Sequence, residues 1–287
     1  MGALPEFIAD YTIFTNWKPS VGLRLNAQYY NVDEIYYNIT DSINVEISNN
    51  SFAGRVGFAS SISNSVLFTL GGKIFYRTFN SKNVDLSFPI PKSSGFGLFS
   101  NIVIDTYDRN IYPTKGLFLN MNGEYIFGEL EKIAYNFTTS YWKFFLNYNQ
   151  YFPISKRFIY SQFATGAVTL ADNLFFSERY FLGGELNYKN YIFPLTGYHF
   201  MEIMGHNIAA AGMALRYEPW NGKFIFLQGN AGIAEDSLED FIKPSDIYYG
   251  GSFGLGIKTI IGPIEYRIST NSYNHKVAHW IKIGYNF

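Results

Sequence analysis

The residues Gly95 to Tyr125, GFGLFSNIVIDTYDRNIYPTKGLFLNMNGEY, decide the fold, because they contain two strands and the turn between them. After Gly116, apolar and polar side chains alternate, which is the period of two that a pleated strand imposes. The same alternation precedes the turn. Asp108, Asn110 and Pro113 are turn formers, because Asp and Asn bond to their own backbone and Pro fixes φ. The stretch predicts an antiparallel hairpin with one apolar and one polar face.

The composition is unusual for a soluble globular protein. Of 287 residues, 20% are aromatic and only 16% are charged. No run approaches the ~18 consecutive apolar residues of a membrane-spanning helix. A formal net charge of -1 argues against a nucleic-acid partner, which needs a basic surface, and the lack of cysteine excludes disulfides and thiolate metal sites. A sheet with one apolar face remains, either packed as a soluble sandwich or closed as a barrel in lipid.

The start of the chain, MGALPEFIADY, has neither the basic nor the apolar region of an export signal. We therefore expect a mature or trimmed chain whose signal is absent. We expect residues 1–287 to form a single barrel domain, with no periplasmic repeat domain in this chain.

Alternating segments recur about every 12 to 25 residues and predict fourteen strands. One of them runs from Ser51 to Ser61, where Phe52, Val56 and Phe58 oppose Arg55. Turns are expected at residues 32–34 and at Asn49 and Asn50. Asp172 to Gly205 has no sustained alternation and predicts a long loop, which is usually functional or mobile.

An even strand count places both termini on one side, with short connections on one rim and long ones on the other, as outer-membrane barrels have. Closure also leaves no sheet edge in lipid. The sequence thus predicts an all-β, transmembrane antiparallel barrel with periplasmic termini and an extracellular loop at 172–205. The polar strand faces would line a wet lumen, with Arg24, Glu46, Arg55, Lys73, Arg77, Asp105, Glu124, Arg216, Lys258, Glu265, Arg267 and Lys282.

Four motifs, in order, resemble the outer-membrane insertase and secretion-pore superfamily of bacterial surface antigen barrels. That superfamily includes barrel-assembly insertases, two-partner secretion transporters and patatin-fused autotransporters. The resemblance implies sixteen strands, so the expected number is fourteen to sixteen. The motif residues are Asp105, Asp108, Arg109, Tyr112, Pro113, Thr114 and Gly116 in the turn; Phe181, Leu182, Gly183 and Gly184 at the start of the sixth extracellular loop; Gly262 and Pro263 in the C-terminal hairpin; and Tyr285 and Phe287 in the terminal insertion signal.

The resemblance also implies that the loop folds into the barrel, where an Arg of a Val-Arg-Gly-aromatic motif meets an acidic residue of the wall. Gly197 and Tyr198 match the last two motif positions, but Thr196 occupies the Arg position and Asn230 the acidic one. The absence of both charges is internally consistent, because either charge without the other would be buried without a partner. Whether the loop is locked without them is left open.

Chemistry-bearing patterns point away from an enzyme. Gly250 to Gly254 matches G-x-S-x-G, but a nucleophile elbow needs a strand, a sharp turn and a helix, and these residues lie within an expected strand. We expect no catalytic site, cofactor or metal. The histidines have no metal-ligand spacing; they are His199, His206, His275 and His279.

The small residues Ala209 to Ala214 have two interpretations. They leave room for a folded-in loop, or they form a flat outer patch for subunit contact, so a homodimer stays open.

The resemblance implies protein insertion or translocation across the bacterial outer membrane. A client strand would pair at a seam between the first strand, Phe7 to Thr15, and the last, Val277 to Phe287. The expected partners are outer-membrane lipids, client proteins and barrel assembly machinery. The alternative is a passive pore, or a membrane anchor and translocator for a missing passenger such as a patatin-like lipase. A barrel-embedded lipid hydrolase using Ser252 is the third hypothesis.

Overall fold

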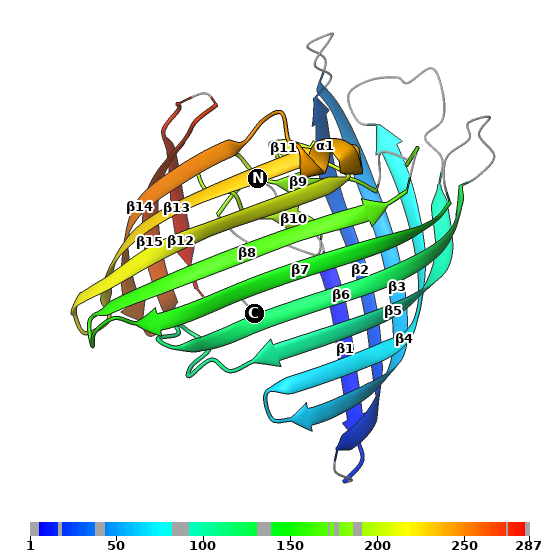
Figure 1. Ribbon diagram of the computed structural model, residues 1–287, viewed down its shortest axis with the longest axis horizontal. Helices are drawn as coiled ribbons and strands as arrows, with labels where there is room; N and C mark the ends of the chain where they lie inside the picture. Colours follow the sequence, from blue (N-terminus) through cyan, green and yellow to red (C-terminus); the bar gives the residue numbers. More distant parts are fainter. Residues whose placement is uncertain are drawn as a thin grey trace. The chain divides into compact units, whose positions relative to one another are not determined.

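The computed structural model describes residues 6–16, 19–37, 44–81, 92–130, 139–171, 173–174, 178–185, 191–273 and 275–284. These residues are almost entirely strand (Figure 1), which confirms the all-β prediction. Thirteen strands form one sheet whose order follows the chain, and three short strands form another. The beginning of the strand expected at 132–152 lies outside the described residues, as do Tyr285 and Phe287.

The large sheet consists of β1 (Glu6–Phe14), β2 (Ser20–Tyr37), β3 (Asn44–Ser63), β4 (Val66–Ser81), β5 (Ser93–Asp105), β6 (Gly116–Leu130), β7 (Ser140–Pro153), β8 (Phe158–Leu170), β12 (Asn207–Trp220), β13 (Lys223–Glu235), β14 (Tyr248–Thr259), β15 (Gly262–Asn271) and β16 (Ala278–Ile283). The small sheet consists of β9 (Tyr180–Leu182), β10 (Ile192–Phe193) and β11 (Ile203–Gly205). A short helix, α1 (Leu238–Ile242), follows β13. None of the helices in the described ranges is long and apolar enough to cross a membrane.

The chain divides into two compact units. Unit 1 comprises Met1–Ile102, Asn122–Lys143 and Leu170–Phe175, and unit 2 comprises Val103–Met121, Phe144–Thr169 and Phe176–Phe287. The expectation of a single barrel domain stays a prediction.

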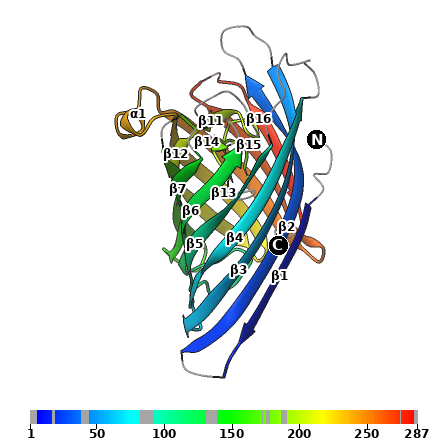
Figure 2. The ribbon, with the colours of Figure 1, turned by 90° about the vertical axis from the view of Figure 1, so that its right-hand side faces the viewer.

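In unit 1, β1 to β4 are neighbours in the sheet and appear side by side in Figure 2. Phe52, Val56 and Phe58 of β3 are 46%, 50% and 71% exposed, while Arg55 points to the other face and contacts Glu124. Apolar side chains that remain exposed along one face are what a strand with lipid on that side requires. The alternation predicted for this segment is confirmed.

The turns predicted at residues 32–34 and at Asn49 and Asn50 are wrong. β2 and β3 run continuously through them for 18 and 20 residues, with Asn31 opposite Asn50 and Val32 opposite Asn49. Asn31 Nδ2 donates to Asn50 Oδ1 at 2.5 Å, and Ser48 Oγ donates to Asn31 Oδ1 at 3.4 Å. These cross-strand bonds use the amides that would otherwise close a turn.

Two expected strands therefore merge, and the large sheet has thirteen strands in the described residues instead of fourteen. With β9, β10 and β11 the total is sixteen, within the predicted range. Because the sheet count is odd, the argument from an even number no longer supports periplasmic termini, and that placement stays a prediction.

On the polar face of unit 1, Glu124 is buried between two cations. Arg55 Nη2 lies 3.1 Å from Glu124 Oε1, and Lys73 Nζ forms an ion pair with Oε2. The Arg55 guanidinium also lies over the Phe99 ring, 5.7 Å from its centroid. Pairing offsets the cost of burying these charges.

In unit 2, the small sheet packs against the large one. β9 pairs with β10 in parallel and with β11 antiparallel, and Figure 1 places all three behind β12 and β13. Leu182 and Phe193 are fully buried in a cluster that includes Ile208 and Ala210 of β12. The described part of the long loop is thus a packed insert, and Ala210 gives it room, as one interpretation of the small-residue strand predicts.

Candidate functional site

The predicted turn motif occupies residues 106–115, between β5 and β6, and Asp108 organises it. Its carboxylate accepts hydrogen bonds from the Thr114 hydroxyl, the Thr114 amide at 2.8 Å and the Lys115 amide at 3.2 Å. Burial acts to raise the pKa of Asp108, but these bonds and nearby Arg109 outweigh it and lower that pKa to about 2. The carboxylate is thus a fixed part of the turn.

The ends of the turn are shaped by Asp105 and Gly116. Asp105 Oδ1 accepts a hydrogen bond from the Tyr107 amide at 3.0 Å. Gly116 has a φ of 111°, and a Cβ there would lie 2.3 Å from the Thr106 carbonyl oxygen. Only glycine fits that position.

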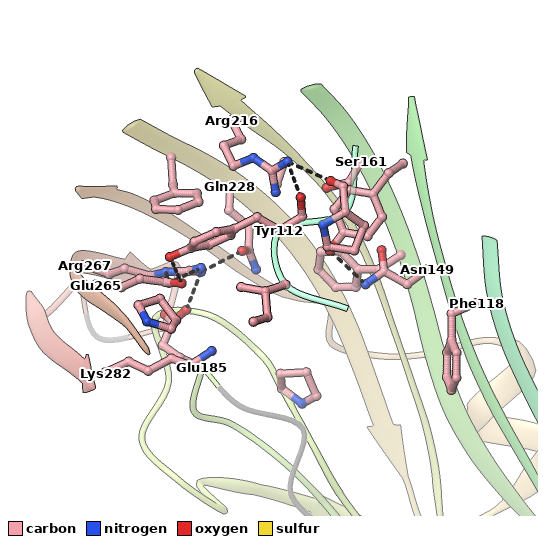
Figure 3. Close-up of a pocket in the computed structure, with 18 of the residues that line it drawn as sticks. Tyr112, Phe118, Asn149, Ser161, Glu185, Arg216, Gln228, Glu265, Arg267 and Lys282 are labelled. Carbon is pink, nitrogen blue, oxygen red and sulfur yellow. Dashed lines mark hydrogen bonds and ion pairs between the residues drawn. The ribbon is translucent and has the colours of Figure 1, made fainter. Parts of the chain in front are cut away.

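Tyr112 and Pro113 attach the turn to the strands of unit 2 (Figure 3). The Tyr112 hydroxyl donates to Glu265 Oε1 of β15 at 2.9 Å. Arg216 of β12 donates to the carbonyl oxygens of Tyr112 and Pro113 at 3.0 and 2.7 Å. Burial, followed by the charge of Glu265, raises the pKa of the Tyr112 phenol, which keeps it a donor. Tyr112 and Pro113 thus lie toward the interior of unit 2, whereas Asp105, Asp108 and Arg109 are exposed.

The first loop motif forms the buried strand β9 and the bend after it. Phe181 and Leu182 are fully buried. Gly183 and Gly184 have φ values of 137° and 84°, and a Cβ on Gly183 would lie 2.0 Å from the His199 carbonyl oxygen. Glycine is needed for the chain to turn this closely.

The second loop motif, Gly197 and Tyr198, lies against β14 and β15. Gly197 has a φ of 93°, and a Cβ there would lie 2.2 Å from the Thr270 carbonyl oxygen. Asn271 Nδ2 donates to the Gly197 carbonyl oxygen at 2.7 Å, and the Tyr198 hydroxyl donates to the Tyr249 carbonyl oxygen at 3.3 Å. The loop backbone is therefore in direct contact with the wall.

The two positions that lack the family's charges meet. With the Asn230 amide oriented to satisfy both neighbours, its Oδ1 accepts from the Thr196 amide at 2.8 Å and its Nδ2 donates to the Gly250 carbonyl oxygen at 3.0 Å. Both side chains are buried. A neutral contact at these two positions avoids burying an unpaired charge, and it helps to hold the loop against the wall.

Sequence reasoning missed a second connection between the loop and the wall, in which Glu185 and Gln228 both contact Arg267. Arg267 Nη1 of β15 lies 3.3 Å from Glu185 Oε2 of the loop and donates to Gln228 Oε1 of β13 at 3.0 Å. Burial raises the pKa of Glu185, although Arg267 acts in the opposite direction. Alternation placed Arg267 on the polar face, but Glu185 lies 82 positions earlier in the chain.

These groups surround a cavity of about 490 Å³ within unit 2. Its wall combines apolar side chains with polar side chains and charges of both signs, so it can hold water beside the polar groups. Lining residues labelled in Figure 3 include Tyr112, Asn149, Ser161, Glu185, Arg216, Gln228, Glu265, Arg267 and Lys282.

The remaining motifs are strand and turn residues. Gly262 has a φ of 112° and begins β15 beside Pro263, whose carbonyl oxygen accepts from the Gly284 amide at 2.9 Å. Ser252 is buried in the middle of β14, which continues to Thr259. Among the described residues there is no group of three or more side chains arranged to hold a metal ion.

Comparison with known proteins identifies the fold. The chain is similar to BamA from Haemophilus ducreyi, crystallised without POTRA domains 1–3, with 15% identity and a TM-score of 0.70 over 98% of this chain and 60% of that one. It is similar to CdiB from Acinetobacter baumannii, with 15% identity and a TM-score of 0.61 over 98% of this chain and 50% of that one. It is also similar to CdiB from Escherichia coli, with 14% identity and a TM-score of 0.62 over 98% of this chain and 52% of that one.

The chain thus spans about half to three fifths of the length of these solved structures. No curated protein sequence matches it. The family model described as the OMP85 superfamily matches residues 10–287, nearly the whole chain. The predicted resemblance is confirmed: the chain belongs to the OMP85 superfamily and is a β-barrel protein of the bacterial outer membrane.

Proposed function

We propose that this barrel assists the insertion of proteins into the outer membrane or their translocation across it. Membership of the OMP85 superfamily supports this general role. The finer proposal is that a client strand pairs with the first or the last strand of the sheet, at a seam where those two strands meet.

The observation that carries the proposal is that the strand order ends in β1 on one side and β16 on the other. An edge strand has unpaired backbone N–H and C=O groups, which are costly in lipid. Phe7, Tyr11 and Ile13 of β1 and Ile281 and Ile283 of β16 are exposed apolar side chains. An added client strand would satisfy the backbone groups and share this apolar surface, which is recognition by β-augmentation.

The partners follow from this surface. We propose that lipids cover the exposed apolar side chains, that client proteins and barrel assembly machinery bind at the strand edges, and that a second copy is a further candidate. The second copy would contact the exposed face of β12, on which Ala211 and Met213 lie.

The test measures folding of a client outer-membrane barrel into liposomes with and without this protein. We expect faster folding with it. A panel of disulfides between β1 and β16, such as Phe7→Cys with Ile283→Cys, should abolish the acceleration, and reduction should restore it. The control is Ala9→Cys with Ala27→Cys, which joins paired residues of β1 and β2 and leaves the seam unchanged. Undiminished folding after complete cross-linking of the β1–β16 pair would contradict the seam.

The runner-up function, a passive pore or a translocating anchor for a passenger domain, is favoured by the cavity in unit 2, whose wall includes charges of both signs. It predicts ion conductance in planar bilayers with no acceleration of client folding. A lipid hydrolase would release fatty acid and lose that activity in Ser252→Ala.

A further inference from the structure

Tyr112 of the turn and Thr196 of the loop are joined by a continuous set of hydrogen bonds within unit 2. The Tyr112 hydroxyl donates to Glu265 Oε1 at 2.9 Å, and Glu265 Oε2 accepts from Arg267 Nη2 at 2.9 Å. Figure 3 shows Tyr112, Glu265 and Arg267 next to one another, with dashed lines at their contacts. One carboxylate of β15 thus contacts both the turn and an arginine.

From Arg267 the contacts divide into two branches that reach the loop. In one, Arg267 Nη1 donates to Glu185 Oε2 at 3.3 Å, and that oxygen also accepts from the Thr196 hydroxyl at 3.2 Å. In the other, Arg267 Nη1 donates to Gln228 Oε1 at 3.0 Å, and Gln228 Nε2 donates to the Thr196 oxygen at 2.8 Å. Both branches end at Thr196, which the Asn230 contact also holds.

The charged side chains that make these contacts are largely buried. The side chains of Glu265 and Glu185 are only 5% and 6% exposed, and that of Arg267 is 20% exposed and lies over the Phe226 ring. Between buried side chains, hydrogen bonds are electrostatically stronger than in water and polarise one another. Arg267 donates hydrogen bonds to two buried carboxylates, those of Glu265 and Glu185. A change at one carboxylate therefore alters how strongly Arg267 binds the other.

We propose that Tyr112, Glu265 and Arg267 couple the turn to the loop, so that the Tyr112 hydroxyl helps to keep the loop seated against the wall. The mechanism is competition for one guanidinium. When Tyr112 no longer donates to Glu265, that carboxylate takes a larger share of Arg267, and the contact of Arg267 with Glu185 weakens. These are positioning residues, and the proposal does not depend on the proposed function.

The test uses the absence of native cysteine. Leu195→Cys places a single thiol at a fully buried loop position, so a membrane-impermeant maleimide reacts with it only when the loop leaves its seat. Labelling rates are measured in four proteins that carry this thiol: the background, Tyr112→Phe, Thr196→Val and the double variant. A heat-dependent mobility shift on gels verifies that each protein is folded.

We expect Tyr112→Phe to raise the labelling rate roughly threefold or more, and the double variant to react at least about threefold more slowly than the product of the two single effects predicts. The matched control is Tyr107→Phe, which removes a hydroxyl from the same turn that donates to the Asn149 carbonyl oxygen at 3.4 Å and takes no part in the set. It should leave the rate unchanged.

Three results would overturn the coupling: an unchanged rate in Tyr112→Phe, independent effects that multiply in the double variant, or an equal rise in Tyr107→Phe. If Tyr112→Phe does not fold, Arg267→Lys replaces it. That variant keeps the charge but lacks the guanidinium fork, and it too should raise the labelling rate.

Discussion

Two buried charge clusters in this barrel are built in different ways. In unit 1, Glu124 is paired with Arg55 and Lys73, and all three project from strands of the large sheet. In unit 2, Glu265 and Arg267 of β15 bind side chains from the turn and the loop, which interrupt the strands. The first cluster holds strands together. The second holds the turn and the loop onto strands. Changes in the two should therefore affect different properties: global stability in the first and the position of the loop in the second.

The largest effect should come from Glu124→Gln, which leaves Arg55 and Lys73 without their shared counter-charge. Breaking a buried ion pair by removing one partner costs about 3–5 kcal/mol. The measurement is the free energy of unfolding in urea, with the barrel in lipid or detergent. A loss no larger than that of an exposed ion pair would mean that this cluster does not hold the strands of unit 1 together.

Gly197→Ala should be next, and it should act on the loop. Alanine at a φ of 93° is strained, and its Cβ would overlap the Thr270 carbonyl oxygen, so about 2 kcal/mol or more of loop seating should be lost. Labelling of the Leu195→Cys thiol reports it. The matched control is Gly222→Ala. Gly222 also has a positive φ, 74°, but the nearest atom to a Cβ there is 3.5 Å away, so alanine would be strained without a clash. Equal effects on labelling would contradict the assigned clash.

The turn should respond to pH through Asp108. The folded pKa is lowered to about 2 from an unfolded value of ~3.9, so its contribution to stability is present above pH 4 and is lost as the pH falls toward 2. In Asp108→Asn this part of the pH profile should flatten, as measured by urea unfolding between pH 5 and 2. Asp240→Asn, on exposed helix α1, is the comparison. If the pH profile of Asp108→Asn were identical to that of the unmodified chain, Asp108 would not contribute to the pH dependence of stability.

The smallest effect should come from Asp10→Asn. Its partner is Arg24, 2.6 Å away, and both side chains are about one third exposed. Partly exposed ion pairs contribute ~0.2–1 kcal/mol. A loss comparable to that in Glu124→Gln would show that burial does not separate the two classes of ion pair in this protein.

Sequence could predict what depends on neighbours along the chain. The hairpin around residues 106–115 and the alternation of Phe52, Val56 and Phe58 follow from a local period, and both are present in the structure. The glycines at 183, 184 and 197 were identified by resemblance, and their backbone angles explain why those motifs contain glycine.

Sequence could not predict what depends on partners far along the chain. Asn49 and Asn50 look like a turn until Asn31 is placed beside them, because the same amide bonds either its own backbone or a neighbouring strand. Glu185, Gln228 and Arg267 meet only after the loop folds inward. Resemblance identified the contact positions Thr196 and Asn230, but not the hydrogen bond between them.

The uninterrupted length of β3 has a consequence for how the sheet meets the two zones of a bilayer. Twenty residues at ~3.3 Å each give about 65 Å of strand, or about 45 Å of height at a 45° tilt, whereas the hydrocarbon core is only ~30 Å thick. Part of the β2–β3 ribbon must therefore extend beyond the hydrocarbon core into the head-group region, where the polar cross-strand bonds of Asn31, Ser48 and Asn50 are tolerated. A ribbon of this length meets lipid head groups as well as lipid tails, so its ends can respond to the charge and packing of the head groups.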